Sequence, residues 1–583
     1  MKKLYQFLID QPYIFSKKPN SMLKLFKKIR KQYKYEAYLL IIICIAFYLR
    51  TFNINWDNGY YFHPDERALI MTSLPVQFPT NLADILSVES SLNPHFFAYG
   101  SLPIYLLKIC AEIFGLINPV LKAYGGIHIV GRLISASFDT ATVFVVYLIC
   151  AKLFSKKVGL LSSLLYCFSV LPIQLSHFFA VDTILTFFMT TTILWLIHFT
   201  KKPSNKNAFF AGIFFGFSLS TKISALILIP VIIISLMLSL HQNKKNKRIK
   251  SKNIEEAIIF TLSSAIIFFC TQPYAIIDFR EFAQQTTAQT QMSNNAFIFP
   301  YTLQYVGKIP YLYELKNIFL WGLGPVIGLL SASGIVYMTL KQGKKIVFML
   351  PAVFLFVYFF IFGKFAVGFI RYMLPVYPMF TIFAGWFLSE IVIKFIPKKY
   401  FKNYLITKSL IFLLVMIISI YPVSFLSIYL HANTRIQASD WINKNIPQGS
   451  RLAIEHWDDS LPVYGMQNYT QLTLPLYDPD TKDKWSGIDS TLRVTDYIII
   501  ASGRLYIPLQ KLTDCKKLPD NRCYPLTASY YKKLFSGELG FRKIAEFKSE
   551  PTIPILNIHI NDVFADENFT VFDHPKIMIF KKE

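Results

Sequence analysis

Charged residues are few in this sequence, and acidic ones are scarce. Asp and Glu number 35 against 60 Lys and Arg, and together they make up 16% of the 583 residues, whereas 53% are hydrophobic. A soluble protein of this length buries its core with far fewer apolar residues. The composition therefore predicts a polytopic membrane protein, which is mainly α-helical.

Signatures of several other protein classes are missing. No zinc-ligand, helix-turn-helix or RNP-like pattern accompanies the net charge of +25, and the basic residues lie in short clusters between apolar runs. Such clusters are typical of cytoplasmic loops, so we predict no nucleic-acid partner. No small-residue cleavage site follows the first apolar run, which favours a retained signal anchor over a cleaved signal peptide.

Cysteine is also rare, with seven in the chain. Five lie in apolar segments, where cysteine is usually a small hydrophobic residue: Cys44, Cys110, Cys150, Cys167 and Cys270. Cys515 and Cys523 instead bracket the polar stretch KKLPDNR. They would form a disulfide if this region is extracytoplasmic, since disulfides persist in oxidising compartments.

Eleven apolar runs are long enough to be membrane spans, which need about 20 residues or somewhat fewer with charged ends. They are 37–53, 127–150, 158–176, 183–199, 207–221, 223–240, 255–272, 317–339, 346–362, 372–394 and 407–430. With eleven spans, every basic cluster falls on the cytoplasmic side. The basic segment 1–36 is then cytoplasmic, and the transmembrane domain covers residues 37–431.

This topology leaves two long outer loops, 54–126 and 272–316, and long loops in compact proteins usually carry function. Residues 100–117 resemble a twelfth span, but a span there would invert everything downstream. They are predicted to form an amphipathic surface helix. Residues 432–583 alternate strand-like and helix-like runs, which predicts an extracytoplasmic soluble α/β domain. It contains neither a glycine-rich phosphate loop nor a metal-spaced Cys/His cluster.

Charged side chains in or beside membrane spans are costly and are candidates for function. They are Asp65, Glu66, Arg132, Asp139, Asp182, Lys222 and Arg371. In the predicted topology all except Asp139 lie at or near the outer ends of their helices, close to His63 and His177. These two histidines are more often structural than catalytic, and we treat them as candidate substrate contacts.

Each charge also has a structural interpretation. The carboxylates of Asp65, Glu66 and Asp182 suit helix N-termini, and Lys222 can snorkel to the membrane surface. Arg132 can pair with Asp139, two turns away in the same run, and Arg371 can be an interfacial anchor. Proton-coupled transport would require such groups near the bilayer midplane. Carboxylates grouped with Arg and Lys suit a different chemistry, in which the cations hold a lipid-borne phosphate while a carboxylate takes the proton of an attacking hydroxyl.

Five stretches resemble the GT-C superfamily of polyprenyl-phosphate-sugar glycosyltransferases. Within it the chain is most similar to the dolichyl-phosphate-mannose protein mannosyltransferases and their bacterial relatives, including the aminoarabinose lipid A transferases. The stretches are FHPDE (62–66), the run from GRLISASFD to LLSSLLY (131–166), HFFAVDTILTFF (177–188), GIFFGFSLSTKISAL (212–226) and GFIRYMLPVYPMF (368–380).

The resemblance implies roles for these residues. Asp65 would be the general base or would orient the acceptor, with Glu66 assisting, and Asp182 would touch the sugar or the acceptor. Arg132, Lys222 and Arg371 would hold the donor phosphate. Because helical neighbours diverge by about 100°, Asp65 and Glu66 are not expected to share one role. Some GT-C enzymes use a divalent metal and others do not, so a metal stays open and no other cofactor is expected.

The predicted function is therefore a membrane hexosyl- or pentosyltransferase of the plasma membrane. It would move a sugar from a polyprenyl-phosphate donor to a glycan, lipid or protein acceptor on the outer face, by inverting single displacement. Two alternatives stay open: a polymerase or ligase of diphosphate-linked saccharides, and a flippase or transporter of lipid-linked sugars.

Overall fold

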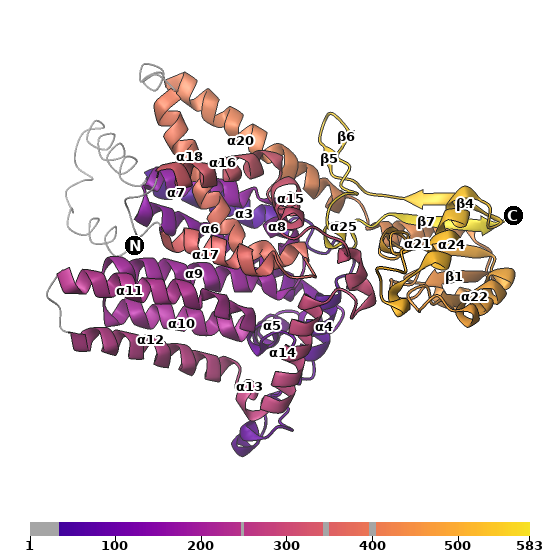
Figure 1. Cartoon of the computed structure of the whole chain (residues 1–583), viewed down its shortest axis with the longest axis horizontal. Helices are drawn as coiled ribbons and strands as arrows, with labels where there is room; N and C mark the ends of the chain where they lie inside the picture. Colours follow the sequence, from indigo (N-terminus) through magenta and orange to yellow (C-terminus); the bar gives the residue numbers. More distant parts are fainter. Residues whose placement is uncertain (1–33, 246–249, 342–348, 396–403) are drawn as a thin grey trace.

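The computed structural model describes residues 34–245, 250–341, 349–395 and 404–583. Most of the predicted cytoplasmic segment 1–36 lies outside these ranges. So do parts of three basic clusters that separate the apolar runs: KKNKRIKSK (244–252), KQGKK (341–345) and KFIPKKYFKNYLITK (394–408). Within them, helices occupy the first three quarters of the chain and a small sheet domain lies near its end. Figure 1 shows the sheet domain at one end of a group of long helices.

Long apolar helices form the membrane part, because a chain in lipid must satisfy its backbone hydrogen bonds internally. They are α3 (Lys34–Thr51), α6 (Ile127–Leu153), α7 (Lys156–Cys167), α8 (Val170–Ser176), α9 (Val181–Lys201), α10 (Asn205–Thr221), α11 (Ile229–Lys245), α12 (Lys250–Thr271), α16 (Pro325–Lys341), α17 (Met349–Phe362), α18 (Tyr377–Phe395) and α20 (Tyr404–Leu426). Figure 1 shows α9, α10, α11 and α12 packed side by side.

Within the described ranges, six helices are long and apolar enough to cross a membrane. They are Ile127–Leu153, Val181–Lys201, Ile223–Leu240, Lys252–Thr271, Ile370–Ile391 and Phe412–Asn445. A seventh span results if α7 and α8, bent by 58° at their junction, are counted as one. The chain is a membrane protein. Its other predicted spans are also helical, but they are shorter or carry more charge, so the number eleven stays a prediction.

Close helix packing explains several glycines in the membrane part. A Cβ atom on Gly216 of α10 would lie 2.7 Å from the carbonyl oxygen of Ser264 on α12. One on Gly385 of α18 would lie 2.7 Å from the backbone nitrogen of Ser162 on α7. Both distances are far below van der Waals contact, and small residues let membrane helices approach this closely.

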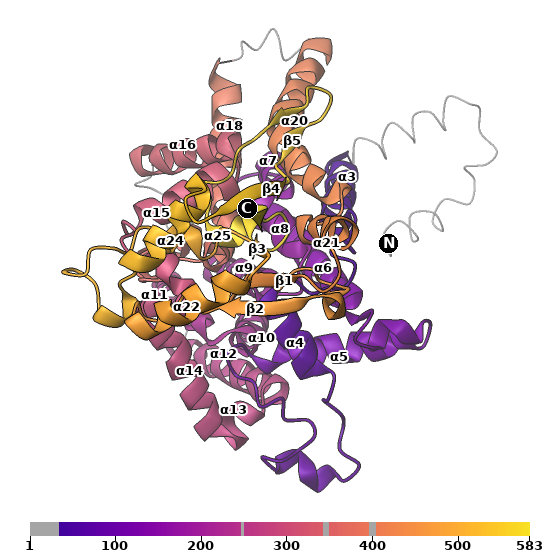
Figure 2. The ribbon, with the colours of Figure 1, turned by 90° about the vertical axis from the view of Figure 1, so that its right-hand side faces the viewer.

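Short elements connect these helices in the two predicted outer loops. The predicted first outer loop contains α4 (Pro64–Ser73), η2 (Leu82–Leu86), α5 (Ser101–Gly115) and η3 (Pro119–Lys122), and the predicted second outer loop contains α13 (Tyr274–Ile277), α14 (Phe279–Asn294), η5 (Pro300–Tyr305) and α15 (Leu312–Lys316). The short 3₁₀ helices η4 (Ile223–Leu228), η8 (Ile370–Val376) and η9 (Ser427–Leu430) and the short π-helix η6 (Asn317–Gly322) adjoin the spans. Figures 1 and 2 together show α5 running across the direction of α9–α12, as a surface helix would.

The C-terminal domain is an α/β structure built on a five-stranded sheet, with strand order β2-β1-β3-β7-β4. Its strands are β1 (Arg451–Glu455), β2 (Thr470–Leu474), β3 (Tyr497–Ile500), β4 (Phe541–Phe547) and β7 (Ile577–Lys582). β2, β1 and β3 are parallel, with Leu452 opposite Tyr497, and β7 is antiparallel to β3 and β4.

Alternating residues of the sheet enter two separate cores, because successive strand side chains point to opposite faces. Ile498, Ile500 and Phe580 pack with α22 (Lys482–Val494) and α24 (Pro525–Ser536). Ile499 and Ile579 pack with α21 (Thr434–Asn445) on the other face. The domain also contains the short helices η10 (Met466–Asn468), α23 (Tyr506–Leu509), η11 (Asp520–Arg522) and α25 (Glu567–Thr570).

A two-stranded hairpin leaves this domain toward the membrane helices. Its strands β5 (Thr552–Ile553) and β6 (Ile558–His559) are antiparallel. Figure 1 shows the hairpin beside α20, apart from the main sheet. The backbone N–H of Thr552 donates to the hydroxyl of Ser427, which directly follows α20, over 2.9 Å. The hairpin is therefore fixed at its base to the end of a membrane helix.

Candidate active site

Helix α4 separates the two carboxylates of the FHPDE stretch. His63 is its N-cap, and its Nδ1 accepts a hydrogen bond from the backbone N–H of Glu66. Glu66 is fully buried, whereas Asp65 keeps 17% of its side chain exposed. This agrees with the angular divergence expected of helical neighbours. Burial and the nearby arginines Arg371 and Arg132 lower the pKa of His63 well below its ordinary range, so its ring is neutral.

Glu66 belongs to a buried network around Arg132. The guanidinium donates to both carboxylate oxygens of Glu66 at 2.8 and 2.7 Å, to both of Asp57 at 2.9 and 2.8 Å, and to the carbonyl of Ile54. These bonds engage all five N–H groups of an arginine. Arg132 has none left for a donor phosphate, so the geometry argues for a positioning role of Arg132 and Glu66 rather than the predicted contact.

Asp57 is the member of this network that the sequence did not single out. Burial alone would raise the pKa of its carboxyl, but Arg132 outweighs burial and lowers it. For Glu66 burial is the larger effect, and its pKa is raised in spite of Arg132. The network holds the first outer loop against α6 and thereby fixes where α4 begins.

The structural alternative in which Arg132 pairs with Asp139 is wrong. Asp139 instead accepts from Arg50 of α3 at 2.5 Å and from the hydroxyl of Tyr166 at 2.6 Å. Both Arg50 and Asp139 are fully buried. This pair joins α3, α6 and α7 within the membrane part, away from the outer-loop residues.

Asp65 forms an ion pair with Arg371, which lies in η8 at the head of α18. The guanidinium carbon of Arg371 also lies 5.3 Å from the ring centre of Phe369 and 5.8 Å from that of Tyr372. Its Nε is buried without a hydrogen-bond partner among the described residues. A buried, unpaired N–H of an arginine is costly, and an anionic oxygen would satisfy it.

Tyr372 connects this pair to a second pair, Lys222 with Asp182. The ammonium of Lys222 lies 4.5 Å from the ring centre of Tyr372 and 5.4 Å from that of Tyr99. Lys222 also approaches Asp182 at 3.8 Å. Arg371 and Lys222 therefore lie against the same ring, and Asp65 and Asp182 are their ion-pair partners, which brings together four predicted site residues from four segments of the chain.

His177 lies outside this group. Its ring nitrogens are 2.9 Å from the carbonyl oxygens of Ile173 and Phe52, and its ring stacks on Tyr429 at 4.2 Å. The side chain is fully buried. This environment is that of a structural histidine, and no substrate contact follows from it.

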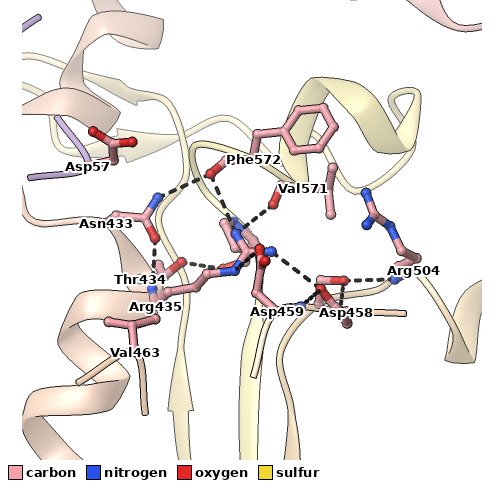
Figure 3. Close-up of polar contacts among 12 residues, drawn as sticks. Asp57, Asn433, Thr434, Arg435, Asp458, Asp459, Val463, Arg504, Val571 and Phe572 are labelled. Carbon is pink, nitrogen blue, oxygen red and sulfur yellow. Dashed lines mark hydrogen bonds and ion pairs between the residues drawn. The ribbon is translucent and has the colours of Figure 1, made fainter. Parts of the chain in front are cut away.

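The C-terminal domain contacts the region of α4 through charged residues that the sequence analysis did not single out. Arg435 is buried, donates to the carbonyl of Val571 at 2.8 Å and pairs with Asp459 at 3.2 Å (Figure 3). Its guanidinium carbon lies 5.1 Å from the ring centre of Phe62, just before α4. Asp459 in turn approaches Arg67 of α4 at 3.8 Å.

Arg504 extends this contact toward the second outer loop. It donates to Glu567 at 2.7 Å, and the amide of Gln304 donates to the same carboxylate. A cavity of about 400 Å³ lies beside these residues, lined by both the C-terminal domain and the second loop. Among the described residues, no group of three His, Cys, Asp or Glu side chains is arranged to hold a metal ion.

Comparisons with known proteins agree with this architecture. Residues 105–276 match a family model described as dolichyl-phosphate-mannose-protein mannosyltransferase. The archaeal oligosaccharyltransferase AglB from Archaeoglobus fulgidus, solved in complex with an inhibitory peptide and a dolichol-phosphate, aligns with a TM-score of 0.52 and 12% identity, over 95% of this chain and 89% of its own.

Two other solved structures align with lower scores. ArnT from Cupriavidus metallidurans, bound to undecaprenyl phosphate, is 11% identical over 82% of this chain and 95% of its own, with a TM-score of 0.43. The S. cerevisiae protein O-mannosyltransferase Pmt1-Pmt2 complex, bound to the sugar donor, is 14% identical over 46% of this chain and 36% of its own, with a TM-score of 0.32. No curated protein matches the chain.

The family model and the AglB-like fold confirm the predicted resemblance to the GT-C glycosyltransferases. They also confirm the general architecture: a mainly helical membrane protein with a C-terminal sheet domain.

Proposed function

We propose that this chain is a membrane glycosyltransferase that moves a sugar from a polyprenyl-phosphate donor to a hydroxyl of its acceptor. The observation that carries this proposal is the meeting of Asp65 with Arg371, beside Lys222. A carboxylate paired with one cation that has an unsatisfied N–H, with a second cation against the same tyrosine ring, suits proton transfer beside a bound phosphate. The donor class is supported by the matching family description and by the dolichol-phosphate that accompanies AglB.

The reaction balances with these residues. Asp65 accepts the proton of the acceptor hydroxyl, whose oxygen forms a new bond to the anomeric carbon. The bond from that carbon to the phosphate oxygen breaks, and its electrons leave with the polyprenyl phosphate. Arg371 and Lys222 stabilise the negative charge that develops there. One carboxylate and one displacement give inversion, and no second carboxylate is needed for a covalent intermediate.

Two features support a site on the extracytoplasmic side. The basic clusters are expected on the cytoplasmic side. The site residues then lie at the outer ends of their helices. The C-terminal domain covers the same end and contains the disulfide Cys515–Cys523, which an oxidising compartment favours. We propose residues 432–583 as an extracytoplasmic domain. The acceptor would bind in the cavity beside Arg504, which faces both this domain and the second loop.

The test compares wild-type protein with Asp65→Asn in proteoliposomes that contain radiolabelled polyprenyl-phosphate sugars. A general base contributes about 10²–10⁴-fold, so Asp65→Asn is expected to lose transfer by at least 100-fold. Rates are compared at a temperature at which both proteins are folded, because loss of the ion pair with Arg371 also lowers the melting temperature. Asp84→Asn is the matched control, because Asp84 is an exposed carboxylate of the same outer loop.

Equal rates in Asp65→Asn and wild type would show that Asp65 has only a structural role, in the first turn of α4 and as the partner of Arg371. Consumption of diphosphate-linked donors in place of monophosphate donors would favour the polymerase or ligase. Movement of the lipid-linked sugar across the bilayer without a change of bonds would favour the transporter.

A further inference from the structure

The tip of the β5–β6 hairpin exposes large apolar side chains. Ile555 is fully exposed, and Leu556 and Ile558 expose 65% and 51% of their surface. Residues 551–561, with the sequence PTIPILNIHIN, contain no Asp, Glu, Lys or Arg. Exposed apolar groups that lie together mark an interaction surface.

The turn holds these side chains outward at a conformational cost. Ile555 has φ of +71°, a left-handed conformation that β-branched residues rarely adopt. The backbone N–H groups of Leu556 and Asn557 donate to the carbonyls of Pro554 and Ile553, which closes the turn. An isolated two-stranded hairpin is marginally stable in water, so a second surface is expected to support this one.

The neighbouring membrane helix identifies that surface. Exposed apolar residues on α20 recur at helical spacing along one side: Phe412, Leu413, Met416, Ile417, Ile420 and Val423. This stripe is what a lipid-facing side requires. It continues through the exposed Leu430, three residues beyond Ser427, where the hairpin is attached.

Figure 1 shows the hairpin projecting sideways from the end of α20, next to the membrane helices and separate from β4 and β7. The tip of the hairpin therefore lies at the level of the outer end of α20. A surface without charge, continuous with a lipid-facing stripe and level with a helix end, fits the outer leaflet of the membrane.

We infer that the β5–β6 hairpin inserts its tip, residues 553–558, into the outer leaflet and anchors the C-terminal domain to the membrane surface. The partner is the hydrocarbon region of the lipid, and no particular headgroup is required. The anchor holds the domain over the outer ends of the helices, and it does so whatever reaction the site performs.

The test places the photo-crosslinking residue p-benzoylphenylalanine at Leu556 in the full chain, reconstituted in vesicles of phosphatidylcholine with tritium-labelled acyl chains. Phe412, exposed on α20, is the positive control. Ile544 is the matched negative control, because it is a partly exposed apolar residue on β4, an edge strand of the main sheet. Illumination is expected to attach labelled lipid at positions 556 and 412 at least tenfold more than at 544.

Lipid attachment at 556 no higher than at 544 would overturn the inference. Attachment to a second copy of the chain in place of lipid would also overturn it. The same substitution at Ile558 repeats the test at a second exposed position, so that a local disturbance of the turn cannot decide the outcome. Melting temperatures equal to that of wild type show that each variant is folded.

Discussion

His574 pairs with two buried carboxylates, one of which, Asp573, connects the segment before β7 to the membrane part, and removal of His574 is the sharpest test of this cluster. Its ring nitrogens lie 2.5 Å from Asp573 and 2.8 Å from Asp562. The other oxygen of Asp573 accepts from Gln174 of α8 and from Tyr429, both at 2.9 Å. All these side chains are buried. Substitution of His574 by Gln removes the positive charge and leaves two carboxylates enclosed.

The magnitude follows from the pKa. Burial alone would lower the pKa of His574, but the two carboxylates raise it from 6.5 to about 10. At about 1.4 kcal/mol per unit this corresponds to at most roughly 5 kcal/mol. Breaking a buried ion pair by removing one partner costs about 3–5 kcal/mol. Both estimates of the lost stability have the same order of magnitude. We expect a loss of this size to lower the melting temperature by about 5–10 °C.

The pH dependence has a definite sign. Below pH 6.5 the histidine is protonated in the folded and the unfolded chain, so the ion pairs contribute fully. Above pH 6.5 the unfolded histidine loses its proton first, and the contribution disappears as the pH passes about 10. The melting-temperature difference between wild type and His574→Gln should therefore shrink steadily from pH 6.5 to pH 10.

The assay is thermal unfolding in detergent at several pH values, with His559→Gln as control, because His559 is an exposed histidine of the hairpin. A difference that is constant from pH 6.5 to pH 10, or that grows toward alkaline pH, would refute the reasoning. So would an equal loss in His559→Gln.

Two further variants test other parts of the structure. Arg132→Lys offers three N–H donors to a network that uses five, and it leaves Asp57 and Glu66 incompletely paired. It should lower the free energy of unfolding by about 3 kcal/mol. An unchanged melting temperature together with lost donor binding would instead support Arg132 as a phosphate ligand. Cys515→Ser opens a short disulfide loop and should destabilise the C-terminal domain by about 2–3 kcal/mol, seen as faster proteolysis there; equal proteolysis of the oxidised wild type and the variant would contradict this.

The membrane helices could be predicted because their signal is local. An apolar run long enough to span lipid is visible in the sequence without knowledge of its neighbours, and helices do occupy the predicted runs. The number of membrane-spanning helices was harder to predict from the sequence. α3 carries Lys34, Glu36 and Arg50, and α10 has 17 residues, so length and charge alone do not decide such helices.

The pairing of charges depends on contacts between distant segments, and sequence spacing misled there. Arg132 and Asp139 lie two turns apart on α6, yet Arg132 faces the first outer loop and Asp139 faces Arg50 of α3. The importance of Asp57 could not be seen, because its burial depends on how the loop returns to α6. Asp65 and Arg371 were each predicted from their motifs, but their contact joins residues about 300 positions apart and became evident only in the fold.

The contact between Phe572 and His63 has a consequence for the order of synthesis. The two rings lie 4.4 Å apart, and Arg504 lies over the ring of Phe572 at 5.8 Å. During translation the loop that begins α4 emerges early, whereas Phe572 is added only after all the membrane helices and most of the sheet domain. Phe178 can stack on the N-cap of α4 early, but the face that Phe572 covers stays open until the chain has been made as far as this residue and brought to the same side. A chain released just before Phe572 would insert its helices but would lack the side chain that closes over the start of α4.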